Sequence, residues 1–310
     1  TAKRGVLLRR FGQEVIRVTA GKRVHGTGSV PGGVNKALTI AERDELLKDV
    51  YHIVQWSRDA VHLIQKVHTQ DPGLYNSFGI FRSNFMSLVG NNGDLDFYHG
   101  TLRARDDNGK ILFDHVDYQQ YDRYIEEEVR PWSYMKFPFF KSIGKEHGWY
   151  KVGPLVRVQN CNQISTPFAE HERKEFVDYA GGSPLHAPLA YHWTRMIEML
   201  HAAEVIKELL HDDDLLGGEL MVQGERQTDG VGVIEAPSQV ALPDEALLSE
   251  RPSDPDGERT CVGPRPPPEA LSPPAAKRTL LSMGAVAPPG KPAPPLAETE
   301  AHAPGKDVSP

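Results

Sequence analysis

The sequence has 310 residues, a net charge of −7 and two cysteines, Cys161 and Cys261, which lie far apart. The charge is spread without long basic runs, which argues against a nucleic-acid surface, and two distant cysteines exclude a disulfide framework and favour a reducing compartment. No apolar run approaches the ~20 residues of a transmembrane helix, so we expect no membrane span. The sequence starts at Thr1 without a signal-peptide pattern, so we expect that it begins inside a longer gene or was trimmed.

Composition divides the chain near residue 237. Residues 1–237 contain every Trp, Tyr and Phe, whereas residues 238–310 contain no aromatic residue, no Ile and 16 of the 25 Pro. A segment so poor in large apolar side chains cannot compensate for the entropy of ordering itself. We therefore predict a folded unit over residues 1–237 and a disordered Pro/Ala-rich tail over residues 238–310.

A Gly-rich loop follows the first predicted helix. Apolar residues recur at spacings of three and four over residues 5–20, which predicts that helix. The next residues, 21–34, read Gly-Lys-Arg-Val-His-Gly-Thr-Gly-Ser-Val-Pro-Gly-Gly-Val, a run that suits neither a helix nor a central strand. Two phosphate-binding patterns fail, since Pro31 stands at the third Gly position of a GxGxxG and Arg23 follows Gly-Lys. The loop is placed to press backbone against a protein partner, a cofactor or a helix junction, and a plain inter-helix turn is the alternative.

Two long helices and a hairpin are predicted further along the chain. Thr39 and Glu42 form a capping-box pattern, and the apolar stripe that follows predicts a helix of about 30 residues, ended by Pro72-Gly73. The sequence Asp107-Asn108-Gly109 between alternating segments predicts a hairpin. A second long helix is predicted from Pro188 to Leu210.

The remaining segments are predicted to be short or irregular. Asp117 is expected to cap a short helix that ends at Arg130-Pro131. Residues 131–168 are rich in aromatic residues and proline, which predicts a loop packed on the core, with a partner surface as the alternative. Residues 231–234 are predicted to form a short apolar strand that leads to Glu235-Ala236-Pro237.

Few residues form a pattern of catalytic or metal-binding chemistry. His192, Arg195, Glu198, His201 and Glu204 recur on the second long helix, and we interpret them as a solvated or hydrogen-bonded face; metal ligation is the alternative. Cys161 is solitary and is interpreted as a buried structural thiol. The sequence contains no HExxH, GxSxG or Cys/His metal cluster.

Several runs resemble the large subunit of nickel–iron hydrogenases, most of all the cytoplasmic, bidirectional, NAD-linked group. The loop at 21–34 is similar to a loop of that family, although the quinone-site subunit of respiratory complex I has a related one. Longer similar runs occupy residues 129–138, 148–158, 190–204 and 230–237. The resemblance covers nearly all of residues 1–237.

The resemblance implies a fold, an activity and partners. The fold is α+β and mostly α, with a long-helix bundle core and small β-hairpin additions. The activity is reversible oxidation of H2 to protons and electrons at a Ni–Fe centre, with electrons passed through the iron–sulfur clusters of a small subunit, and a diaphorase module, to NAD or a similar acceptor. Residues that line or support the metal site by resemblance are Arg23, His25, Pro31, Gly32, Gly33, Glu235 and Pro237.

The sequence also departs from that family. The family holds its metals with four cysteines in two CxxC pairs, and neither pair occurs here, so we expect no metal ligands and no activity from this chain alone. The family continues Glu-Ala-Pro with Arg-Gly, whereas this chain has Ser238 and matches nothing beyond it. We interpret residues 1–237 as a central fragment joined to its tail by a frame error or aberrant join; a natural divergent tail is the alternative.

Three hypotheses about function remain open. The first is a fragment of a hydrogenase large subunit. The second is a quinone-binding subunit of the complex I type, which lacks the cysteine pairs by nature. The third is a non-catalytic helical interaction module on the same scaffold.

Overall fold

The computed structural model describes residues 2–225 and 231–233. The predicted tail over residues 238–310 and the predicted site residues Glu235 and Pro237 lie outside the described residues. The predicted short strand at 231–234 lies partly outside them, and its described residues, 231–233, belong to no strand. None of the described helices combines the length and apolar character that crossing a membrane requires.

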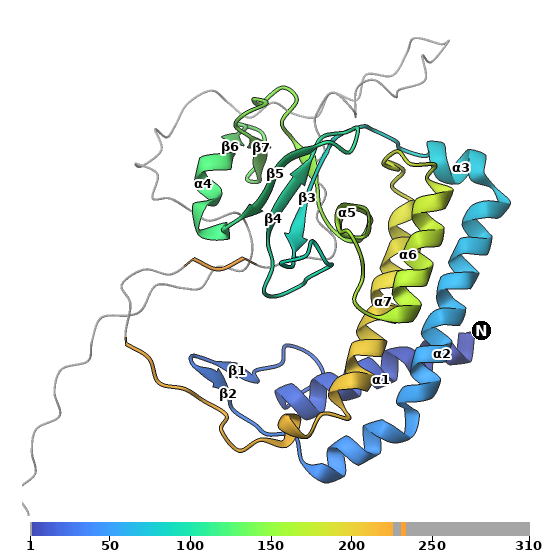
Figure 1. The fold of residues 1–310 in the computed structure, drawn as a ribbon, viewed down its shortest axis with the longest axis vertical. Coiled ribbons are helices and arrows are strands. Elements are labelled where there is room, and N and C mark those ends of the chain that lie inside the picture. Colours follow the sequence, from blue (N-terminus) through green and yellow to red (C-terminus); the bar gives the residue numbers. More distant parts are fainter. Residues whose placement is uncertain (1, 226–230, 234–310) are drawn as a thin grey trace, which may run out of the picture. The chain divides into compact units, whose positions relative to one another are not determined.

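Long helices form one side of the described fold (Figure 1). Helices α2 (Ile40–Gln70) and α7 (Ala190–Leu209) pack against each other, α6 (Pro167–Tyr179) packs against α7, and α1 (Ala2–Ala20) packs against α2. Thr39 accepts a hydrogen bond from the Glu42 backbone N–H, and the Glu42 carboxylate accepts one from Thr39, so the predicted capping box is present. The three helices predicted from periodicity are therefore confirmed.

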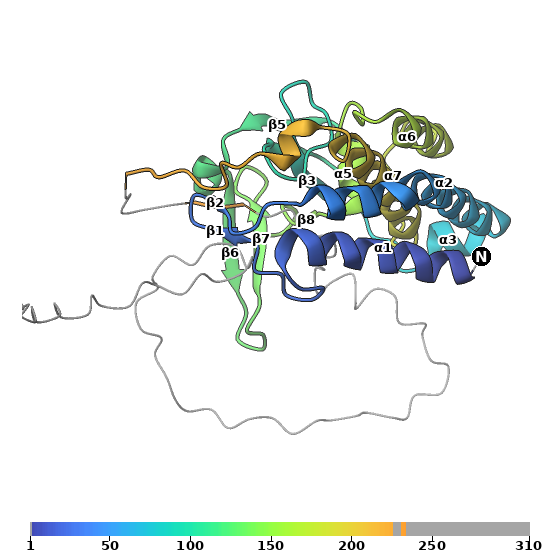
Figure 2. The ribbon, with the colours of Figure 1, turned by 90° about the horizontal axis from the view of Figure 1, so that it is seen from below.

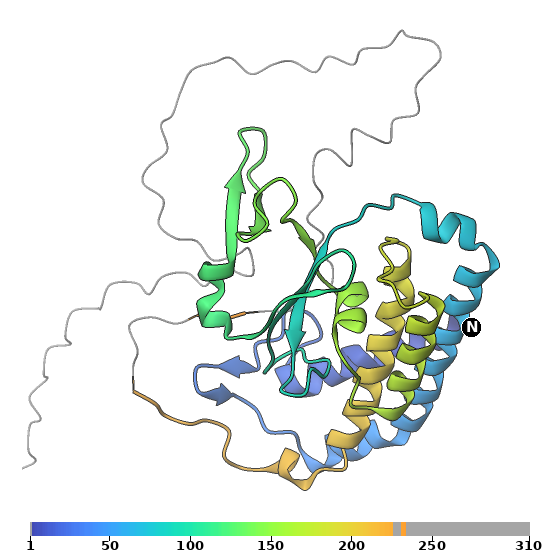
Figure 3. The same cartoon turned by 45° about the horizontal axis from the view of Figure 1, so that its top comes forward.

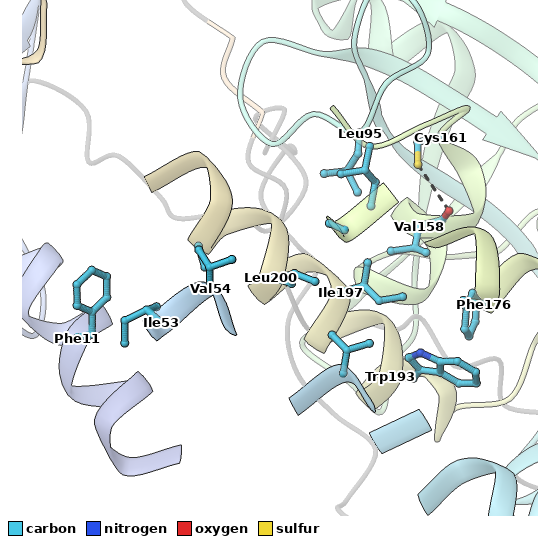
Figure 4. Packing of buried hydrophobic residues seen from close by; sticks show 14 of the residues in the cluster. Phe11, Ile53, Val54, Leu95, Val158, Cys161, Phe176, Trp193, Ile197 and Leu200 are labelled. Carbon is cyan, nitrogen blue, oxygen red and sulfur yellow. Dashed lines mark hydrogen bonds between the residues drawn. The ribbon is translucent and has the colours of Figure 1, made fainter. Parts of the chain in front are cut away.

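The hydrophobic core lies between these helices (Figure 4). Phe11 of α1 lies beside Ile53 of α2, Val54 of α2 lies beside α7, and residues of α7 continue the core toward α5 and α6. The Trp193 ring meets the Phe176 ring edge-on at 5.1 Å, and both side chains are buried. Burial of these apolar side chains is what holds the long helices together, since isolated amphipathic helices are marginal in water.

A four-stranded sheet has the order β5–β4–β3–β8. Strands β3 (Asn84–Val89), β4 (Thr101–Arg105) and β5 (Ile111–Val116) are antiparallel neighbours, and β8 (Tyr150–Lys151) runs parallel to β3. Helix α5 (Pro154–Asn160) packs against β3 and α7, so it joins the sheet to the helices (Figure 1). The hairpin predicted at Asp107-Asn108-Gly109 connects β4 and β5 and is confirmed.

The helix predicted after Asp117 is wrong in its second half. Asp117 does cap a 3₁₀ turn, Tyr118–Gln120, but helix α4 (Tyr121–Tyr124) ends there. Strand β6 (Ile125–Val129) follows and pairs antiparallel with β7 (Lys136–Phe140). The glutamates of β6 favour a helix locally, and the cross-strand partners outweigh that preference.

The irregular loop predicted over residues 131–168 is also wrong in part, because β7, β8, α5 and the first residues of α6 lie within it. The expectation that its prolines break regular elements failed at Pro154 and Pro167, which begin α5 and α6, and at Pro138, which lies inside β7 opposite Glu127. Pro72 likewise begins the short helix α3 (Pro72–Ser77) directly after α2 ends. Proline fits the first helical turn because its missing N–H has no intrahelical partner there.

Candidate functional site: the loop after the first helix

The predicted site loop folds back on the end of α1. The Gly21 N–H donates to the Arg17 carbonyl (2.9 Å) and the Thr27 N–H donates to the Ala20 carbonyl (3.1 Å). Figure 2 shows the loop leaving α1 and leading to strands β1 (Ser29–Val30) and β2 (Gly33–Val34). The loop is therefore attached to the helix that precedes it.

Lys36, which follows the loop, forms hydrogen bonds to both of the helices that the loop connects. Its Nζ donates to the Val18 carbonyl at 2.8 Å and to the Glu42 carboxylate at 2.7 Å. The Lys36 hydrogen bond, followed by the Thr39 backbone N–H, lowers the pKa of Glu42 to about 2. This one side chain joins the last turn of α1 to the first turn of α2.

The Pro31-Gly32-Gly33 turn presses against the chain's own segment 220–222. The Val34 N–H donates to the Leu220 carbonyl and the Val222 N–H donates to the Gly32 carbonyl, both at 2.9 Å. A Cβ on Gly32 would lie 2.3 Å from the Val222 oxygen, and one on Gly33 would lie 2.1 Å from the Leu220 oxygen. The expected close backbone approach is thus present, and the partner of the turn is the segment that follows α7.

Arg23 and His25 lie on the exposed part of the same loop. Arg23 pairs with Glu14 of α1 at 2.8 Å. Hydrogen bonds from Arg17 and then Arg23 lower the pKa of Glu14. His25 is exposed and adopts φ +50, a conformation that is uncommon for residues other than glycine. The structure therefore places Arg23, His25 and the glycine turn on one loop. The sequence analysis missed the contacts that hold this loop in place, made by Lys36 and by residues 220–222, because no local sequence pattern indicates them.

Three polar residues of α7, Glu198, His201 and Glu204, are buried and hydrogen-bonded. Arg157 of α5 forms a two-fold ion pair with Glu198, at 2.6 and 2.7 Å. His201 contacts the Thr166 hydroxyl at 2.9 Å, and Glu204 accepts from two backbone N–H groups at the start of α6. The interpretation as a hydrogen-bonded face is confirmed for these three residues, while His192 is exposed. Burial raises the pKa of Glu198 and lowers that of His201.

The described residues do not fit a Ni–Fe centre. Such a centre needs thiolates, and burial raises the pKa of Cys161 to about 12, which keeps it a thiol. Its Sγ donates to the Val158 carbonyl (3.6 Å; Figure 4), as expected of a structural cysteine. In the described part of the chain, no three His, Cys, Asp or Glu side chains are grouped so that they could hold a metal ion.

Comparison with known proteins shows relatives among hydrogenase subunits. The chain is 41% identical over 249 residues to the NAD-reducing hydrogenase HoxS subunit beta of Cupriavidus necator, which covers 77% of this chain and 51% of the relative. It is 36% identical over 242 residues to a subunit of the F420-non-reducing hydrogenase vhu of Methanocaldococcus jannaschii, which covers 78% and 57%. No family model matches the chain. The chain thus spans about half the length of these relatives.

Solved structures agree with this relationship. An NAD+-reducing [NiFe]-hydrogenase in the H2-reduced state matches with a TM-score of 0.73 and 50% sequence identity, over 76% of this chain and 52% of the other. A Ni-Fe-Se hydrogenase from D. vulgaris Hildenborough matches with a TM-score of 0.51 and 18% identity, over 70% and 50%, which concerns the fold alone. The predicted mostly α fold, with the long-helix core of the [NiFe] hydrogenase large subunit, is therefore confirmed.

Proposed function

We propose that this chain is the central part of a [NiFe] hydrogenase large subunit of the cytoplasmic, NAD-linked type. The observation that carries the proposal is the likeness to the NAD+-reducing [NiFe]-hydrogenase, at 50% identity and a TM-score of 0.73. The relative from Cupriavidus necator is also named as NAD-reducing. These relatives favour the hydrogenase hypothesis over both the quinone-binding subunit hypothesis and the non-catalytic module.

The assembly would oxidise H2 reversibly to protons and electrons. The electrons would pass through a small iron–sulfur subunit, then through a diaphorase module, to NAD or a similar acceptor. In this proposal Arg23, His25 and the turn at residues 31–33 support the metal site without ligating it, together with Glu235 and Pro237. Residues of this kind orient ligands and control water access, and their loss commonly costs activity.

The 310-residue chain on its own is proposed to bind no nickel and to be inactive. It contains two cysteines, of which Cys161 is buried and protonated, so it cannot supply four thiolates. Metal analysis of the purified chain checks this directly. Near-stoichiometric nickel in the protein would contradict it.

A chimaera tests the proposed function. Residues 2–225 replace the matching segment of the HoxS subunit beta, which supplies the rest of its own chain, and H2-dependent NAD reduction is measured in the assembled enzyme. We expect activity, and we expect the chimaera with His25→Ala to be less active than the matched chimaera with Tyr98→Ala, since Tyr98 is exposed and outside the loop. A chimaera that assembles and takes up nickel yet does not oxidise H2 would contradict the proposal.

A further inference from the structure

The last turn of α2 carries a fully buried histidine, His68. Figure 3 shows where it lies: the end of α2 and the short helix α3 come together with the end of α6 and the start of α7. Three aromatic rings contact the imidazole, with centroids at 5.0 Å for Tyr75, 5.5 Å for Tyr179 and 5.6 Å for Trp193. These rings come from α3, α6 and α7, so four elements meet at the His68 side chain.

One hydrogen bond fixes which nitrogen of His68 carries the proton. Its Nε2 atom lies 2.8 Å from Asn76 Oδ1. The Asn76 amide nitrogen donates to the Tyr179 hydroxyl at 2.9 Å, so it is the amide oxygen, an acceptor, that faces His68. Nε2 is therefore the donor, which leaves Nδ1 of the neutral imidazole as an acceptor. Burial lowers the pKa of His68, and this favours the neutral ring.

Two buried nitrogen atoms at this place have no hydrogen-bond partner among the described residues, namely His68 Nδ1 and Trp193 Nε1. The Trp193 side chain is 1% exposed, and its Nε1–H can only donate. A buried acceptor and a buried donor thus lie on two rings that contact each other. Buried polar groups are nearly always bonded to protein or to ordered water, because an unpaired one keeps its full desolvation cost.

The geometry of the two rings fits one water molecule between the nitrogens. A water that forms two hydrogen bonds of about 2.9 Å, near the tetrahedral angle, holds its two partners about 4.7 Å apart. The ring centroids of His68 and Trp193 are 5.6 Å apart and the ring planes are inclined by 57°, which is compatible with that separation. Ser57 Oγ of α2 is also buried and unpaired among the described residues, but it lies about three turns earlier, on the order of 16 Å along the helix.

We propose that His68 Nδ1 and Trp193 Nε1 bind one buried water molecule, which accepts from Trp193 and donates to His68. A hydrogen-bonded chain then runs from Tyr179 through Asn76, His68 and the water to Trp193. Apolar packing tolerates small displacements, whereas hydrogen bonds have defined directions, so this chain fixes the positions of α2, α3, α6 and α7 relative to one another. The inference is independent of the proposed function.

NMR of the full 310-residue chain, labelled with ¹⁵N at tryptophan and histidine, tests the inference in the unaltered protein. The sequence has four tryptophans, so the indole signal of Trp193 is the one that remains in each of Trp56→Phe, Trp132→Phe and Trp149→Phe. We expect a cross-peak between this N–H and water that has the sign of dipolar contact and not that of hydrogen exchange. We also expect the histidine ring correlations to show the proton of His68 on Nε2.

A variant and its control complete the test. His68→Phe removes the acceptor, so the water cross-peak of Trp193 should be lost, whereas His52→Phe, which changes an exposed histidine of the same helix, should keep it. Absence of the cross-peak in the unaltered chain, or a proton on His68 Nδ1, would overturn the inference, as would a cross-peak that persists in folded His68→Phe. If His68→Phe does not fold, the two measurements on the unaltered chain decide the question.

Discussion

Gly32→Ala is expected to release the site loop from segment 220–222. The residue adopts φ +91, where a side chain costs about 1–2 kcal/mol. The new Cβ would also lie 2.3 Å from the Val222 oxygen, so the turn must withdraw and lose the two hydrogen bonds that join it to Leu220 and Val222. At about 1 kcal/mol each, these bonds add about 2 kcal/mol to the local opening free energy.

Amide hydrogen exchange measures that opening at the two donors, the N–H groups of Val34 and Val222. A loss of about 2 kcal/mol speeds their exchange about thirtyfold, and the conformational strain adds to this. Gly182→Ala is the matched control, because Gly182 has φ +79 but its added Cβ would meet nothing within 4 Å. Unchanged exchange at Val34 and Val222 in Gly32→Ala, or the same acceleration in Gly182→Ala, would refute the reasoning.

Four further predictions concern stability and the join of the tail. Glu198→Ala should lower the free energy of unfolding by about 3–5 kcal/mol, because it leaves the buried Arg157 charge without its carboxylate; a loss below about 1 kcal/mol in urea denaturation would contradict this. Thr39→Ala should cost about 1 kcal/mol by removing the capping box, and an unchanged thermal midpoint would count against that role. Burial, and then the charge of Arg82, lowers the pKa of Lys151 to about 7, against about 10.4 when unfolded. The unfolded chain therefore binds more protons between these values, so stability should rise from pH 7 to about pH 10, and Lys151→Met should abolish that rise. Finally, the nucleotides after the Pro237 codon, read in another frame, should encode Arg-Gly, then a His-bearing strand and a distal CxxC; their absence from both other frames would remove the frame-error interpretation.

The sequence alone determined the long helices and the hairpin between β4 and β5. In α2 the apolar stripe and the Thr39 capping box agree with each other, and both act within a few residues of the chain. The Asp107-Asn108-Gly109 turn is likewise a local signal. Cys161 could be assigned to the core because a solitary cysteine outside any ligand motif is most often a buried structural thiol. The resemblance at residues 21–34 identified the loop that carries Arg23 and His25.

Only the tertiary structure decided the elements whose stability comes from distant partners. Strand β6 reads locally as the end of a helix, and pairing with β7 makes it a strand. Strand β8 has two residues and exists because it lies beside β3. The contact of Gly32 and Gly33 with segment 220–222 joins parts of the chain that lie far apart in the sequence. Periodicity and capping patterns reflect interactions between residues that are close in the sequence. Hydrogen bonds and packing between remote segments leave no such local pattern, and in this chain such remote hydrogen bonds set the geometry of the candidate site.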